Sequence, residues 1–179
     1  MNCADGSEID PSMAVLHLVA RPLAVVIERL THPTSRAEWS VSAWGETPPL
    51  PAVEALARAG THLPRFAWPL PAGLAAEVIS RPGRQVETWL ASPTPGLPVA
   101  EPAGLATLVT ASGGQRIRVS IGWLLVHPAA RRQGLGRRLV ATLLMVAQQR
   151  AIENVWVETR SDWLAATAFW RDCGFTAPL

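Results

Sequence analysis

GWLLVHPAARRQGLGRRL, residues 122–139, is the stretch that decides the fold. Its apolar first half extends a run from Ile117 and predicts a strand ending at Val126. Glycines at 134 and 136 then mark a tight turn. Over residues 135–150 the apolar side chains recur at helical spacing, which predicts an amphipathic helix with one buried face. The stretch therefore reads as a strand, a short turn and a helix.

The start of this helix has the chemistry of an anion site. The first backbone N–H groups of a helix lack internal partners, and the helix dipole adds positive potential at the same end. Glycines allow a phosphate to approach the backbone closely. Arg131, Arg132 and Arg137 add cationic donors, so a diphosphate is the ligand that fits. The competing interpretation is a tight connection beside a solvated face of arginines.

The segment before the decisive stretch predicts more of the same sheet. Residues 85–91 and 104–111 alternate like strands. Ser112-Gly-Gly-Gln115 has the composition of a turn, so residues 117–126 should return as an antiparallel partner of 104–111.

The segment after the helix predicts a crossover. Residues 154–159 form a short candidate strand, and a strand-helix-strand order makes it a parallel neighbour of 117–126. A second helix should span residues 163–173, capped by Ser161 or Asp162 and ended by Gly174 in the left-handed conformation.

The first half of the chain gives weaker signals. Residues 13–20 alternate like a strand, and short helices fit 23–30, 52–59 and 74–79. Residues 31–51 have the composition of a loop. Its tryptophans, Trp39 and Trp44, either line an acceptor site or fill the core.

Composition bounds the class of protein. The 179 residues suffice for one domain, and a hydrophobic share of 49% supports a packed core. A net charge of +2 gives no reason to expect a nucleic-acid or membrane partner. Cys3 and Cys173 form neither a disulfide framework nor a metal pattern. The apolar run at 13–27 is too short to span a bilayer, so we expect a cytoplasmic protein without a metal.

Two motifs resemble one known family. PxxRxxGLGxxL, residues 128–139, is similar to the acetyl-CoA signature of the GNAT N-acetyltransferases. VETRSDWLAA, residues 157–166, leads to a closing Gly174-Phe175 pair and resembles the family's later strand and helix. The resemblance covers residues 86–175 and does not reach 1–84.

The resemblance implies an α/β (α+β) fold of the GNAT type. This fold is a mixed, mostly antiparallel sheet with a splayed central parallel strand pair, flanked by helices. One domain would span residues 1–179, with 85–179 as the acetyl-CoA-binding core and 1–84 as a poorly resembling N-terminal part. In the family, the pantetheine arm inserts between the splayed strands.

By the same resemblance, the activity is acetyl transfer from acetyl-CoA to a primary amine of a small molecule or peptide. The alternative is a non-catalytic acyl-CoA-binding sensor or interaction module, and a homodimer is possible. Backbone groups at two strand positions would pair with pantetheine, and amides at the helix start would hold the pyrophosphate. The implied cofactor-binding residues are Leu124, Val126, Arg131, Arg132, Gln133, Gly134, Leu135, Gly136 and Arg137.

The sequence departs from the family pattern at both catalytic positions. It contains no Tyr, and Trp170, the candidate catalytic residue at this position, stands where the family commonly places a Tyr that protonates the leaving thiolate. Ser120 stands where several members carry a base Glu. We therefore take Glu158 as the candidate base, against the alternative of a strand carboxylate paired with Arg160. His127, at the end of its strand, more simply faces solvent or caps the turn.

The chain also departs from the family after the Gly174-Phe175 pair. Family members usually continue with two further strands, whereas residue 179 comes soon after the pair. Either the strand at 13–20 fills that edge, a partner subunit does, or the sheet is short.

Overall fold

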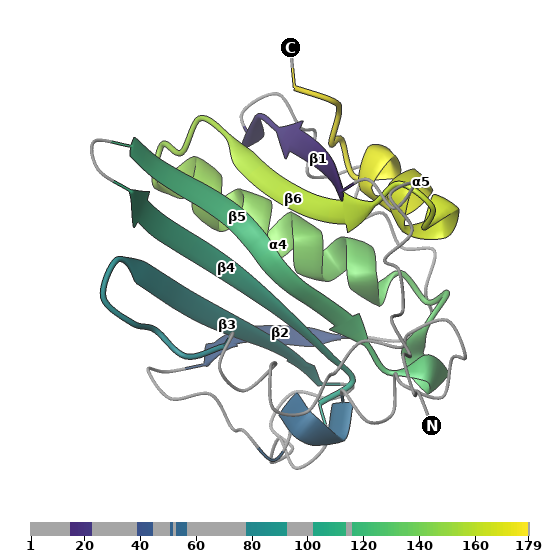
Figure 1. Ribbon diagram of the computed structural model, residues 1–179. Coiled ribbons are helices and arrows are strands. Elements are labelled where there is room, and N and C mark those ends of the chain that lie inside the picture. The colour runs from purple at the N-terminus through teal and green to yellow at the C-terminus, as the bar shows by residue number, and fades with distance from the viewer. Residues whose placement is uncertain are drawn as a thin grey trace, which may run out of the picture.

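The computed structural model describes residues 15–22, 39–44, 51, 53–56, 78–92, 102–113 and 116–178. Within these ranges the chain forms a six-stranded sheet with the order β1-β6-β5-β4-β3-β2 (Figure 1). The strands are β1 (Val15–Ala20), β2 (Ser40–Trp44), β3 (Arg84–Ser92), β4 (Gly104–Gly113), β5 (Arg116–Val126) and β6 (Val155–Arg160). The named helices are the short η2 (Pro128–Ala130), α4 (Leu135–Gln149) and α5 (Leu164–Asp172).

Neighbouring strands run antiparallel except β5 and β6, which are parallel. α4 connects this pair and crosses one face of the sheet, behind β4 and β5 (Figure 1). The expected mixed sheet with a central parallel pair is thereby confirmed. The elements expected from residue 85 onward also match, with ends shifted by no more than two residues.

The main core lies between α4 and the sheet. The buried side chains of α4 are Leu135, Leu139, Val140, Ala141, Leu143, Leu144, Val146 and Ala147. They pack in one cluster with inward-facing strand residues such as Val119, Ile121 and Val157. Burying one such Leu or Val side chain contributes about 1.5–3 kcal/mol, so the helical periodicity of the sequence determines which face meets the sheet.

A second, smaller core lies on the opposite face of the sheet. Val53, Leu56 and Val78 are buried there against Leu90 of β3 and Leu105 of β4. Residues 53–56 are helical, as expected for the segment 52–59 in so far as it is described. Around Leu90 and Leu105 the sheet is therefore covered on both faces.

β1 fills the edge of the sheet next to β6, the position for which the sequence left three alternatives open. The two strands pair antiparallel from Val15↔Arg160 to Ala20↔Val155. On its other side β1 forms a bridge in which the Val19 and Thr176 amides each donate to the other's carbonyl, at 2.8 and 2.9 Å. Of the three alternatives, the strand from the start of the chain is the one that occupies the sheet edge next to β6.

Two expectations are wrong. Ser40–Trp44 is strand β2, paired with β3, and not part of a loop. Its alternation explains this, because Trp39 and Val41 reach the main core whereas Trp44 packs on the second core. The expected side-chain cap of α5 is absent: the N-cap is Trp163, and the Asp162 carboxylate accepts hydrogen bonds from Arg160 at 2.9 and 3.0 Å.

Some expectations lie outside the described residues. These are the helix at 23–30 and most of the helix at 74–79, of which only the last two residues are described, as a bend. Across the part of the chain that is described, no helix has the length and apolarity needed to cross a membrane. No group of three or more His, Cys, Asp or Glu that could hold a metal occurs among those same residues.

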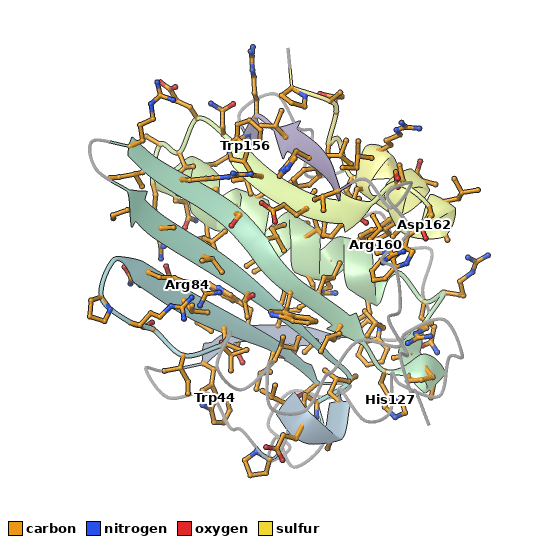
Figure 2. The ribbon with its side chains drawn as sticks, in the orientation of Figure 1. Trp44, Arg84, His127, Trp156, Arg160 and Asp162 are labelled. Atoms are coloured by element: carbon orange, nitrogen blue, oxygen red, sulfur yellow. The ribbon has the colours of Figure 1, made fainter. Side chains whose placement is uncertain are left out.

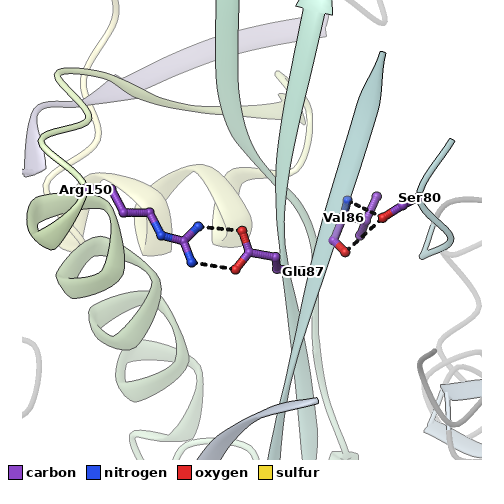
Figure 3. A network of polar contacts seen from close by, with 4 residues as sticks. All are labelled: Ser80, Val86, Glu87 and Arg150. Carbon is purple, nitrogen blue, oxygen red and sulfur yellow. Dashed lines mark hydrogen bonds and ion pairs between the residues drawn. The ribbon is translucent and has the colours of Figure 1, made fainter. Parts of the chain in front are cut away.

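The far end of α4 is tied to the sheet by an ion pair (Figure 3). Arg150, the C-cap of α4, donates to both carboxylate oxygens of Glu87 on β3, with one bond of 2.7 Å. This hydrogen bonding raises the pKa of the Arg150 guanidinium above its ordinary value. Beside it, the Val86 N–H donates to the Ser80 hydroxyl oxygen at 2.9 Å. The Arg150–Glu87 pair therefore links α4 to β3 at the end away from the helix N-terminus.

Candidate acyl-donor site

The candidate site begins at a β-bulge in β5. Ala106 pairs with Leu124 and Leu108 with Ile121, so Gly122 and Trp123 together face the single residue Thr107. The buried Thr107 hydroxyl accepts a hydrogen bond from the Trp123 N–H at 2.8 Å. An added Cβ at Gly122 would approach Val109 Cγ2 to 2.7 Å, a distance that real Cβ atoms do not show. The close packing of the Val109 and Thr107 side chains at the bulge therefore favours glycine at this position.

The bulge reverses the faces of β5. Before it, Val119 and Ile121 point into the main core; after it, Leu124 and Val126 do so, while Trp123 and Leu125 pack on the second core. One extra residue in a strand has this effect because side chains alternate with a period of two.

β5 and β6 separate at the level of this bulge. The two strands pair only from Val119↔Val155 to Ile121↔Val157, and they part beyond that point (Figure 1). The splayed parallel pair implied by the family resemblance is thus present, with its vertex at Ile121 and Val157.

Beyond the vertex, part of the β5 backbone faces away from β4. The His127 N–H donates to Ala103 O at 2.8 Å. Because alternate residues of an antiparallel ladder exchange hydrogen bonds, Leu125 bonds to β4, whereas Leu124 and Val126 direct their N–H and C=O groups toward the diverging β6. One of these groups is engaged, since Arg131 Nε donates to Val126 O at 3.1 Å.

The N-terminus of α4 lies at the end of this exposed backbone edge. The chain turns through residues 131–134, where Arg132 and Gly134 have positive φ values of 63° and 79°. Gly134 is the N-cap and supplies no side-chain hydrogen bond. The first hydrogen bond of α4 runs from the Arg138 N–H to Gly134 O, at 3.0 Å. The N–H groups of residues 135–137 therefore have no acceptor carbonyl within the helix, and they form the positive end of the helix dipole.

The side chains around this helix start divide into two groups. Arg137 forms an ion pair with Asp172 of α5 at 3.0 Å, and Gln133 donates to Ala129 O at 2.9 Å. These two side chains are directed to the protein, so only their backbone amides are left for a ligand at the helix start. Arg131 is held against Val126, while Arg132 is exposed at the turn.

His127 and Phe169 make the structural contacts beside the helix start. The His127 ring accepts a hydrogen bond from the Ala129 N–H at 3.2 Å and caps η2, as the capping interpretation expected (Figure 2). A Cβ at Gly136 would lie 3.4 Å from the Phe169 ring and 3.7 Å from Val126, which is ordinary contact. Phe169 of α5 thus packs over the first turn of α4.

Glu158, the candidate base, is the first residue of β6 beyond the vertex, on the sheet face away from α4. Its side chain is 59% exposed and accepts a hydrogen bond from Arg118 of β5 at 3.4 Å. Its partner is therefore Arg118 and not Arg160, which binds Asp162 instead (Figure 2). Glu158 also lies 3.6 Å from Nδ1 of His17. Whether it acts as the base stays a prediction.

His17 and Arg118 were not singled out by sequence reasoning. The Arg118 guanidinium lies 3.4 Å from His17 Nδ1 and stacks 4.9 Å from the centre of the Trp156 ring. His17 comes from β1 and stands opposite Glu158 in the register of β1 on β6. No local pattern in the sequence indicates that register, because the two segments are about 140 positions apart along the chain.

Trp170, the residue at the family's Tyr position, is buried. Its ring makes edge contacts with Phe169 and Phe175, at centroid distances of 5.2 and 5.3 Å. Cys173, one turn further on, is fully buried, and burial raises the pKa of its thiol to about 12. Cys173 is therefore a small apolar core residue. A catalytic role for Trp170 stays a prediction.

Comparison with known proteins agrees with this geometry. Residues 74–175 match the family model described as Acetyltransferase (GNAT) family. None of the curated proteins compared with the chain matches it.

Solved structures share the fold at low sequence identity. A tandem GNAT protein from the clavulanic acid biosynthesis pathway is 22% identical with a TM-score of 0.61, over 92% of this chain and 50% of that one. The Escherichia coli ribosomal-protein-S18-alanine N-acetyltransferase is 22% identical with a TM-score of 0.57, over 79% of this chain and 80% of that one. An aminoglycoside acetyltransferase from an uncultured soil metagenomic sample is 18% identical with a TM-score of 0.57, over 79% and 90%.

These likenesses show the fold alone, and the chain spans about half the length of the tandem protein. The family model is the stronger finding, because it covers more than half of the 179 residues, including the bulge, the turn and α4. This chain belongs to the GNAT acetyltransferase family.

Proposed function

We propose that this protein transfers an acetyl group from acetyl-CoA to a primary amine of a small molecule or a peptide. Acetyl-CoA is the acyl donor used by the GNAT family. The observation that carries the proposal is the uncapped N-terminus of α4, placed at the end of the β5 edge that β4 leaves unpaired. An anion site continuous with an open strand edge fits a ligand with a diphosphate and an amide-bearing arm.

The donor would be held mainly by backbone groups. The amides of residues 133–137 bind the pyrophosphate, and Arg132 lies at the turn to add charge. Because α4 comes directly after β5 and its turn, an arm anchored at the helix start runs back along β5 toward Ile121. Its amides then pair with the outward N–H and C=O groups of Leu124 and with the N–H of Val126, whose carbonyl already accepts from Arg131, in the manner of an added strand.

This placement puts the thioester at the vertex, next to Ile121 and Val157. When bound there, acetyl-CoA supplies the electrophilic carbonyl carbon. The N–H of Leu124 is directed to this side and can polarise the carbonyl, and positioning of the amine supplies much of the rate. Glu158, beside the vertex, is the carboxylate placed to help remove a proton from the incoming ammonium.

A second candidate is a non-catalytic acyl-CoA-binding module. Two observations favour it: Ser120 cannot act as a base, and the Trp170 ring is packed between two Phe rings. This candidate requires the same donor site, so binding alone does not separate the two functions.

One experiment tests both candidates. Calorimetry measures acetyl-CoA binding, and a thiol reagent measures coenzyme A release with glucosamine, sisomicin and a peptide beginning with Ala. These acceptors correspond to the activities named for structurally similar acetyltransferases. Binding with release above background supports the enzyme, binding without release supports the module, and no binding at millimolar donor contradicts both.

A further inference from the structure

We infer that His17, supplied by β1, is the group that accepts the proton from the acceptor ammonium, with Glu158 stabilising the imidazolium that forms. The inference rests on the proposed acetyl transfer. It assigns a catalytic role to a residue outside the region that matches the family model, residues 74–175.

His17 and Glu158 lie together beside the vertex. β6 is paired with β5 up to Val157, and Glu158 is the next residue. His17 stands directly opposite Glu158 on the neighbouring strand. On β1, Leu18 and Ala20 point into the core, so His17 points to the opposite face of the sheet, as Glu158 does. An arm that runs along β5 ends beside this pair.

Both side chains are open to solvent. Those of His17 and Glu158 are 45% and 59% exposed, so an acceptor can reach them and a proton can leave to water. By contrast, Cys173 and Trp170 are buried in the core behind the sheet. Imidazole is also the ordinary side chain that exchanges a proton near neutral pH.

The charged groups around the ring define which nitrogen takes the proton. Arg118 faces His17 Nδ1 at 3.4 Å, and because an arginine can only donate, this contact is a hydrogen bond in the tautomer whose Nδ1 carries the lone pair. Glu158 Oε1 lies 3.6 Å from the same nitrogen. Nδ1 has one lone pair, so its contact with Arg118 breaks when it takes the proton. The protonated Nδ1 then gains an ion-pair partner in Glu158, while Arg118 stays hydrogen-bonded to that carboxylate and stacked on Trp156.

The acceptor ammonium gives one proton to His17 Nδ1 and becomes a free amine. Its lone pair attacks the thioester carbonyl carbon; the new C–N bond forms and the C–S bond breaks, with its electron pair leaving on sulfur. The second nitrogen proton is lost and the thiolate gains one, so the products are the amide, coenzyme A thiol and one proton released from His17 to water.

The test compares two nucleophiles with the whole 179-residue chain. A primary amine from the panel must lose a proton before attack, whereas hydroxylamine is already unprotonated at neutral pH. We expect H17Q to lower release of coenzyme A with the amine by about 100-fold, within the usual range for a general base. With hydroxylamine the loss should be less than about fivefold. A matched control, V15T, changes an exposed residue on the same face of β1 and should leave both rates near the wild-type values.

A second readout does not depend on turnover. In NMR spectra of the four histidine rings, H17Q identifies the His17 signal. Addition of acetyl-CoA should shift that signal in the wild-type protein. Equal losses with both nucleophiles, no loss at all, or an unmoved His17 signal at saturating donor would each overturn the inference. So would donor binding without transfer to any amine, whereas absence of donor binding would defeat the proposed function itself.

Discussion

Replacing Gly134 with Glu should abolish donor binding while leaving the sheet and α4 folded. Gly134 is the N-cap of α4, is half-buried and has a φ of 79°. The substitution places a carboxylate among the amides of residues 135–137, where the pyrophosphate would bind. It therefore tests the anion site at its centre.

The expected effect of Gly134→Glu has two parts, a loss of stability and a loss of acetyl-CoA affinity. A side chain in the left-handed conformation costs about 1–2 kcal/mol of stability whatever its charge. A carboxylate about 4 Å from a phosphate charge adds roughly 4 kcal/mol of repulsion at the effective dielectric constant of a protein surface. Salt and solvent reduce this value, so we expect acetyl-CoA affinity to fall by at least about 100-fold.

Gly134→Ala separates the two parts. It carries the same backbone strain without the charge, so its melting temperature should fall like that of the Glu variant, while its affinity should change by less than about tenfold. Calorimetry with acetyl-CoA and thermal unfolding of both variants provide the measurements. If the folded Glu variant bound acetyl-CoA within about threefold of the wild type, the donor would not lie at the start of α4.

Three further predictions concern the scaffold. Gly122→Ala should lower the free energy of unfolding by about 1–3 kcal/mol in urea titrations and weaken donor binding, because its Cβ meets Val109 at 2.7 Å in the bulge. An unchanged free energy of unfolding would mean that the bulge relaxes without cost. Glu87→Gln should cost about 1 kcal/mol, measured the same way, by breaking the bidentate pair with Arg150, and Arg150→Gln should add little further loss in the double variant. Cys173 should resist Ellman's reagent in the folded protein. Burial raises the pKa of the Cys173 thiol from an ordinary 9.0 to about 12, so above pH 9 the unfolded state loses a proton that the folded state keeps. The free energy of unfolding should therefore decline as the pH rises from 9 toward 12. Rapid labelling of the folded protein, or a free energy of unfolding that does not change over this range, would contradict the burial.

The second half of the fold could be predicted because its signals are local. The apolar spacing of α4, the turn before it and the alternation in β3, β4 and β5 each lie within one element. The crossover rule then makes β5 and β6 parallel. The left-handed Gly174, with φ of 89°, was likewise predictable from its place after a helix.

The remaining features depend on pairing between distant segments. β2 resembles a loop in composition, and it is a strand because Val41 and Trp44 find cores on opposite faces of the sheet. Asp162 could have capped α5, but Arg160 two residues earlier engages its carboxylate. A single extra residue at Gly122 also escapes sequence reading, since only the register with Thr107 reveals a bulge.

The candidate site divides in the same way. The glycines and arginines of one short stretch indicate the backbone anion site, so the sequence alone could predict residues 131–137. The group of His17, Arg118 and Glu158 draws on three strands, and it becomes visible only when β1 is known to lie beside β6.

An NMR titration of the ¹⁵N-labelled protein with acetyl-CoA tests the central claim most directly. The account predicts saturable shifts of the backbone amides of residues 134–137 together with those of Leu124 and Val126, because the donor's diphosphate and arm contact both groups. Saturable binding that leaves these amides in place and moves signals elsewhere would contradict it.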